Sequence, residues 1–198
     1  MKTKKIILAS GSPRRKQILE QVGLKFTIEV SDYEEKPISG VKPYEFVETL
    51  SLEKAKAVAK NHNDAIIIAA DTIVFLNNQI LGKPKTKEDA RGMLKKLSGN
   101  THSVFTGFTI IDTVNKRTIT NHVETKIRFK NLSEEEILAY IETKEPMDKA
   151  GSYGVQDRGA LFVEHIEGDY SSVMGLPILK IFEILKEFGI DILKTYEK

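Results

Sequence analysis

The feature that most constrains this chain of 198 residues is a long apolar run from Ala65 to Phe75, which only Asp71 and Thr72 interrupt. A run of this kind predicts a buried strand, and a carboxylate inside it is costly to bury without a partner. Asp71 therefore needs a metal ion, a cation or exposure at the end of the strand. Two interpretations stay open at this point: Asp71 belongs to a chemical site, or it caps a turn where the strand ends.

Strand patterns and helix patterns alternate along the rest of the chain, which predicts a mixed α/β fold. Ser12 followed by Pro13 is typical of a helix start, and Ser133 with Glu136 is the pattern of a capping box. Further strands are expected at 6–9, 26–30, 79–81, 104–111, 118–129 and 161–166. Helices are expected at 13–22, 43–58, 86–97, 133–142 and 177–188. We expect lobe boundaries in loops near 31–42 and 143–160, with a cleft between the lobes.

The composition excludes several classes of protein. Lysines and arginines number 30 against 28 aspartates and glutamates, a near-balance that argues against a dedicated nucleic-acid-binding surface. The absence of cysteine excludes disulfides, thiolate metal sites and a thiol nucleophile. No apolar run reaches membrane-spanning length, and the basic start of the chain lacks the apolar core of a signal peptide. We therefore expect a cytoplasmic protein that binds neither nucleic acid nor membranes.

The segment SGSPRR, residues 10–15, follows a predicted strand and opens a predicted helix. Small residues let the backbone approach a ligand closely, the start of a helix attracts anions, and two arginines add donors and charge. Ser10, Arg14 and Arg15 are therefore candidates for binding phosphate groups. An ordinary capped helix with two solvated arginines explains the pattern equally well.

Other polar segments are candidates for the same site, each with an alternative. Lys83 could reach a site at Asp71, although a lone exposed lysine is the commoner case. On periodicity alone, Glu35 belongs to a loop and Lys54 to a solvated helix face. None of the four histidines has metal-ligand spacing. Three loops that mix glycine with polar residues favour a binding cleft over chance, and they lie at 148–156, 168–170 and 173–177.

Taken together, these segments resemble the Maf family of nucleoside triphosphate pyrophosphatases. The motifs that carry the resemblance are SGSPRR at 10–15, AADTIV at 69–74, GKP at 82–84, EPMDKAGSYGVQ at 145–156, GDY at 168–170 and VMGLP at 173–177. The resemblance implies a single Maf-like domain over residues 1–198. It also implies an α/β fold of the Maf/ITPase-like type, with a mixed sheet, flanking helices and two lobes around an elongated nucleotide-binding cleft.

The same resemblance implies an activity and assigns roles to residues. It implies hydrolysis of a nucleoside triphosphate between the α- and β-phosphates, with Mg²⁺ or Mn²⁺ as the divalent metal. Asp71 matches the catalytic proton acceptor, and the metal and phosphate site is matched by Glu35, Lys54 and Lys83. Glu35 and Asp71 are the expected metal ligands, because oxygen ligands suit these ions.

Substrate choice in the family is linked to three positions, which Arg14, Thr72 and Gln156 match here. Their combination resembles the subfamily that takes dTTP and UTP, and it leaves open modified or non-standard pyrimidine nucleotides. The related 7-methyl-GTP subfamily usually has tryptophan and glutamate in place of Arg14 and Gln156. The chain departs from the family after Gln156, where Asp157 and Arg158 stand before Gly159 instead of an immediate glycine.

The resemblance also implies a rival hypothesis, a nucleotide-binding regulator of cell division and septum formation without essential catalysis. Such a protein would keep the phosphate cradle and the pocket but would need no general base. The presence of Asp71, Glu35, Lys54 and Lys83 favours the enzyme. In either case the expected partner is a small nucleotide, and the sequence leaves open whether the chain forms a homodimer.

Overall fold

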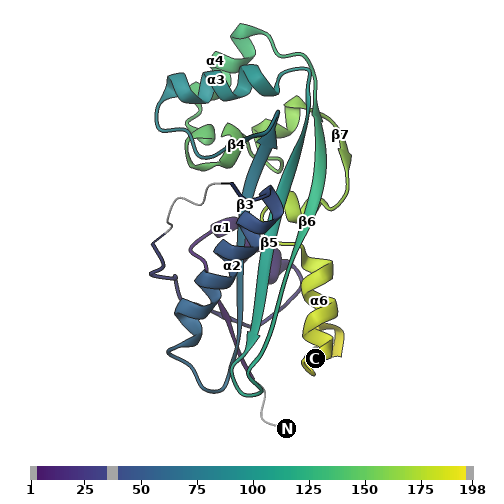
Figure 1. The fold of residues 1–198 in the computed structure, drawn as a ribbon. Coiled ribbons are helices and arrows are strands. Elements are labelled where there is room, and N and C mark those ends of the chain that lie inside the picture. Colours follow the sequence, from purple (N-terminus) through teal and green to yellow (C-terminus); the bar gives the residue numbers. More distant parts are fainter. Residues whose placement is uncertain (1–3, 35–39, 195–198) are drawn as a thin grey trace. The chain divides into compact units, whose positions relative to one another are not determined.

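The computed structural model describes residues 4–34 and 40–194, which form a mixed sheet with helices around it (Figure 1). The seven described strands follow the order β2-β1-β3-β5-β6-β7, with β4 paired to β3. Their bounds are β1 Lys5–Leu8, β2 Thr27–Ile28, β3 Ala65–Leu76, β4 Gln79–Leu81, β5 Thr101–Asp112, β6 Arg117–Phe129 and β7 Val163–Glu167. The β1 strand pairs in parallel with β2 and β3, whereas β4 pairs antiparallel with β3 and β7 antiparallel with β6. The expected α/β class with a mixed sheet is confirmed.

The helices also follow the sequence patterns closely. The α-helices are α1 Pro13–Gln21, α2 Pro43–Ala59, α3 Lys87–Leu97, α4 Glu134–Glu142, α5 Tyr170–Val173 and α6 Ile178–Glu187. Within the described residues there are four short 3-10 helices: η1 Glu145–Asp148, η2 Ala150–Ser152, η3 Arg158–Phe162 and η4 Ile192–Lys194. No helix in the described ranges is long and apolar enough to cross a membrane.

Two helix starts illustrate where local signals succeed and fail. The capping box is confirmed, because the Ser133 hydroxyl accepts from the Glu136 N–H and the Glu136 carboxylate accepts from the Ser133 N–H. The expected helix start is confirmed, with Ser12 at the N-cap and Pro13 first in α1, but the Ser12 hydroxyl makes no capping hydrogen bond. Instead, the Ser12 N–H donates to Ser10 Oγ at 3.2 Å, so the hydroxyl that organises this turn belongs to Ser10.

The chain divides into two compact units. Unit 1 comprises Met1–Asp71, Thr106–Val123 and Gly175–Lys198, and unit 2 comprises Thr72–Phe105 and Glu124–Met174. The boundaries therefore fall within β3, β5 and β6 and before Gly175, and the expectation of boundaries in loops near 31–42 and 143–160 is wrong. The reason is that these three strands, of 12, 12 and 13 residues, are long enough to contribute to both units.

The core of unit 1 lies between its strands and α2. Side chains alternate along a strand, so Ala65, Ile67 and Ala69 point to one face of β3. These three residues are buried in one cluster with Ala55 and Val58 of α2. The α2 helix therefore packs on this face of β3, and Figure 1 shows the helix beside the strand. Asp71 follows these residues on the same face of β3 and is the last residue of this stretch of unit 1.

In unit 2, a small buried aromatic cluster includes Tyr153, which lies three residues before Gln156. The His102 side chain is 2% exposed, and its Nε2 lies 2.7 Å from the Tyr153 hydroxyl. The ring of Phe129 packs edge-on against both side chains. Burial lowers the pKa of His102 to about 4, so its imidazole is neutral at physiological pH.

Candidate functional site

Asp71 is paired with Lys54 in the first unit. The alternation that points Ala65, Ile67 and Ala69 toward α2 points Asp71 the same way, since it is the next residue in this series. Lys54 lies one helical turn before Val58 and therefore on the same face of α2. Its Nζ is 2.6 Å from Asp71 Oδ1, and the two side chains are only 17% and 13% exposed. A cation thus partners this part-buried carboxylate, as the sequence required, and Lys54 does not lie on a solvated helix face.

The SGSPRR segment is organised around Ser10. Its hydroxyl accepts from Arg15 Nη1 at 2.9 Å as well as from the Ser12 N–H, and the residue is buried. Arg15 Nε also donates to the Gly175 carbonyl oxygen at 2.8 Å, which ties this segment to the VMGLP motif within unit 1. Arg14 is the second residue of α1 and is half-buried. Arg15 is therefore held in place rather than solvated.

The parallel pairing of β1 and β3 brings this segment and Asp71 to the same end of the paired stretch. Leu8 stands opposite Ile68 in the register, and the Ala9 N–H donates to the Ile68 carbonyl oxygen at 2.8 Å. Ser10 lies two residues after Leu8, just beyond β1, and Asp71 lies three residues after Ile68 on β3. Ligands of open α/β sheets commonly bind beyond the carboxyl end of parallel pairing, and Ser10 and Asp71 both lie beyond the last parallel pair of β1 and β3.

The second unit holds three other predicted site residues. Thr72 is half-buried on β3, Gln156 is half-buried after η2, and Lys83 is exposed just after β4. The Gly151 N–H donates to the Gly82 carbonyl oxygen at 3.1 Å, so the GKP motif is attached to the segment that leads to Gln156.

Gly151 makes that attachment possible. Its φ of +66° is disfavoured for other residues, and a Cβ there would lie 2.8 Å from a methyl group of Val74 on β3. The glycine motifs of unit 2 therefore join β3, β4 and the Gln156 segment. By contrast, the GDY motif has a local structural role, because the Asp169 carboxylate caps α5 by accepting from the N–H groups of Ser171 and Ser172.

Glu35, the expected second metal ligand, lies outside the described residues. The departure after Gln156 is accommodated, because Asp157 has a φ of −110°, a value open to any residue. The glycine of the family is thus not required by the backbone at this position.

Sequence reasoning missed Gly107 and Ser51, which set the approach of α2 to the sheet. A Cβ on Gly107 would lie 2.3 Å from the carbonyl atoms of Val47, so only glycine lets the helix backbone lie this close to β5. Ser51 Oγ donates to the Glu48 carbonyl oxygen and lies 3.0 Å from Thr109 Oγ1 of β5. An isolated glycine inside a strand pattern is a known sign of close backbone approach, whereas no pattern marks Ser51.

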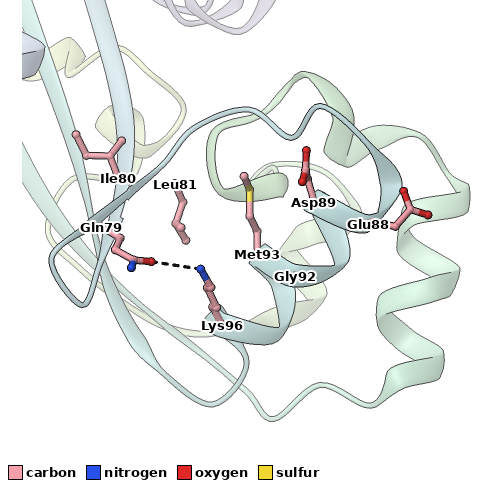
Figure 2. Close-up of a pocket in the computed structure, with 8 residues that line it drawn as sticks. All are labelled: Gln79, Ile80, Leu81, Glu88, Asp89, Gly92, Met93 and Lys96. Carbon is pink, nitrogen blue, oxygen red and sulfur yellow. Dashed lines mark hydrogen bonds between the residues drawn. The ribbon is translucent and has the colours of Figure 1, made fainter. Parts of the chain in front are cut away.

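A separate pocket of about 590 Å³ opens in unit 2 between β4 and α3 (Figure 2). Lys96 Nζ donates to Gln79 Oε1 at 3.2 Å across it. None of the predicted site residues that the structure describes lines this pocket, whose walls are Gln79, Ile80, Leu81, Glu88, Asp89, Gly92, Met93 and Lys96. It is therefore distinct from the candidate site.

Comparison with known proteins first defines the class of fold. The structure resembles that of the Ham1 protein of Staphylococcus aureus, with a TM-score of 0.53 and 14% identity over 92% of this chain and all of that one. At this identity the likeness concerns the fold alone.

The sequence then defines the family. Residues 5–188 match the family described as Maf-like protein, and the chain belongs to this family. A relative from Bacillus cereus (strain ATCC 10987 / NRS 248), named dTTP/UTP pyrophosphatase, is 52% identical over 96% of this chain and 92% of its own length. A Bacillus anthracis protein of the same name is also 52% identical, over 96% and 98% of the two chains.

Proposed function

We propose that this protein is a nucleoside triphosphate pyrophosphatase that hydrolyses dTTP and UTP to the nucleoside monophosphate and pyrophosphate. The observation that carries the proposal is the Lys54–Asp71 pair, a part-buried carboxylate with an amino group 2.6 Å away. The names of the relatives at 52% identity support this substrate pair. The residues are also of the types that the reaction needs.

In the proposed reaction, Asp71 accepts a proton from the water that attacks the α-phosphorus. The new bond joins the water oxygen to that phosphorus, and the bond to the oxygen bridging the α- and β-phosphates breaks. The leaving pyrophosphate carries the developing negative charge. Lys54 and Lys83 stabilise this charge electrostatically, so no covalent intermediate with the protein is required.

Ser10 and Arg15 support binding of the phosphate groups. The hydrogen bonds to Ser10 and to the Gly175 carbonyl fix the guanidinium of Arg15 before substrate arrives. A fixed cation loses less conformational entropy on binding than a mobile one does. The start of α1 lies in the same segment and adds a partial positive charge.

A divalent cation, Mg²⁺ or Mn²⁺, fits the chemistry of Asp71, which offers carboxylate oxygens with part of their surface exposed. Within residues 4–34 and 40–194, no group of three or more His, Cys, Asp or Glu side chains could hold an ion. Asp71 would therefore hold the ion together with phosphate oxygens of the substrate and with water, and Glu35 is the further proposed ligand. When bound, the ion would stabilise negative charge on the phosphates.

We propose that Gln156 selects the base, together with Arg14 and Thr72. The amide of Gln156 carries both a donor and an acceptor, which matches the N3–H and adjacent carbonyl of uracil and thymine. Guanine presents two adjacent donors, which suit a carboxylate instead. We further propose that residues 1–198 act as one Maf-like domain, which the family match over residues 5–188 supports.

The test is pyrophosphate release from UTP, dTTP, CTP, GTP and 7-methyl-GTP, with Mg²⁺, with Mn²⁺ and with a chelator. We expect turnover of UTP and dTTP that requires the cation, with monophosphate and pyrophosphate as the chromatographed products. Diphosphate plus free phosphate would mean attack at the γ-phosphate and would refute the mechanism. Binding of UTP without turnover would support the rival regulator of cell division.

A further inference from the structure

The two ends of the loop that carries Gln156 lie in close contact. We call residues 154–159 the Gln156 loop. Its two ends, Gly154 and Gly159, touch each other, because a Cβ on Gly159 would lie 2.6 Å from the Gly154 carbonyl oxygen and 2.8 Å from the Tyr140 hydroxyl. Any larger residue at Gly159 would push the ends of the loop apart.

The side chains of Glu145 and Tyr140 bind both ends of the loop through hydrogen bonds. The Gly154 N–H donates to the Tyr140 hydroxyl at 3.2 Å, and that hydroxyl donates to Glu145 Oε1 at 2.6 Å. The Gly159 N–H donates to Glu145 Oε1 and the Arg158 N–H to Glu145 Oε2, each at 3.2 Å. Three backbone N–H groups on both sides of Gln156 are thus satisfied by two side chains.

The pair is itself firmly placed. Tyr140 is 4% exposed on α4, where its ring packs edge-on against Phe162. Burial, followed by the hydrogen bond to Glu145, raises the pKa of Tyr140 above its usual range, so its hydroxyl stays protonated and donates. Lys149, which is also buried, donates to the Glu145 carbonyl oxygen at 2.8 Å and fixes the backbone of this residue.

We infer that Glu145 and Tyr140 are positioning residues for substrate selection, which clamp both ends of the Gln156 loop and so hold the Gln156 amide in register with the pyrimidine base. The inference rests on the proposed function of Gln156. Neither residue needs to touch the base or the phosphates. A loop only six residues long and closed at both ends transmits a shift at its base directly to the residue at its centre.

Two variants break the clamp in different ways. Glu145→Gln keeps the size of the side chain but leaves one oxygen where two accept, so its NH₂ group must face a backbone N–H or the tyrosine hydroxyl. Tyr140→Phe keeps the ring against Phe162 and removes only the hydroxyl. Glu142→Gln is the matched control, because Glu142 lies on the same helix, is exposed and pairs with Lys87.

The readout separates base selection from phosphate chemistry. We would measure kcat and KM for UTP and for ribose 5-triphosphate, which has no base. In both clamp variants the kcat/KM ratio of UTP over ribose 5-triphosphate should fall about tenfold or more, mainly through a higher KM for UTP. Hydrolysis of the base-free substrate should stay within about twofold of wild type, as should both substrates in Glu142→Gln.

Equal losses with both substrates would assign Glu145 and Tyr140 a general structural role and would overturn the inference, as would an unchanged ratio. Amide hydrogen exchange of Gly154 and Gly159, followed by NMR in wild type and Tyr140→Phe, tests the clamp without turnover. Faster exchange at both glycines is expected, and unchanged exchange would overturn the inference. A wild type that does not hydrolyse UTP would refute the proposed function, whereas the exchange result would still decide whether the clamp exists.

Discussion

Replacing Gly107 by alanine should damage both the stability of unit 1 and the position of Lys54. The new Cβ would lie 2.3 Å from the carbonyl carbon and oxygen of Val47 and 2.7 Å from the Glu48 nitrogen. Cβ atoms essentially never come closer than 3.0 Å to other heavy atoms, so α2 and β5 must separate by at least the difference, about 0.7 Å. These are backbone atoms, which no change of rotamer can move aside.

The expected magnitude follows from this geometry. Overpacking a core costs roughly 1–3 kcal/mol, and a clash with helix backbone should lie near the upper end, at about 3 kcal/mol. For a chain of this length the melting temperature should then fall by roughly 6–12 °C. Lys54 lies two turns after Val47 on the same helix, and a misplacement of about 1 Å can cost on the order of a hundredfold in kcat/KM.

The assay is urea unfolding together with UTP hydrolysis at a temperature where the variant stays folded. Gly92→Ala is the matched control, because Gly92 lies in α3 and a Cβ there would meet nothing within 4 Å. This control should gain about 0.5–1 kcal/mol, since alanine loses less conformational entropy in a helix. A Gly107→Ala variant as stable and as active as wild type would refute the argument from close packing.

Three further predictions concern the site and the core. Asp71→Asn should fold as wild type does by circular dichroism but lose a hundredfold to ten-thousandfold in kcat, roughly, because an amide cannot accept the proton of water; wild-type turnover would remove Asp71 as the base. Gln156→Glu should lower kcat/KM for UTP and dTTP, through a loss of about 2–4 kcal/mol in transition-state binding. Adding Arg14→Trp should allow some hydrolysis of 7-methyl-GTP. An intact pyrimidine preference in Gln156→Glu would contradict the base-reading role. Because burial holds the pKa of His102 at about 4, below its usual 6.5, the stability from its neutral form is present above pH 6.5 and is lost as the pH falls toward 4. We expect the free energy of unfolding, measured with urea, to fall by about 3 kcal/mol over this range. The fall should disappear in His102→Gln but persist in His165→Gln, which alters an exposed histidine.

The sequence alone determined those features that depend on near neighbours in the chain. The alternation along β3 places Asp71 on the same face as Ala65, Ile67 and Ala69, and a period of two residues is readable without a structure. The capping box at Ser133 depends on two residues three positions apart, so it too was predictable. The ordered motifs were sufficient to indicate the family, which the comparisons confirmed.

Only the tertiary structure decided the partners of these residues. Periodicity placed Lys54 on a solvated face, whereas it pairs with Asp71, 17 residues away in the chain. Arg15 donates a hydrogen bond to the carbonyl oxygen of Gly175, 160 residues away in the chain. Three of the four boundaries between the two units lie inside β3, β5 and β6 and not in loops. Local patterns specify which face of an element is buried, but which segment covers that face depends on how the whole chain packs, and no short-range period encodes this.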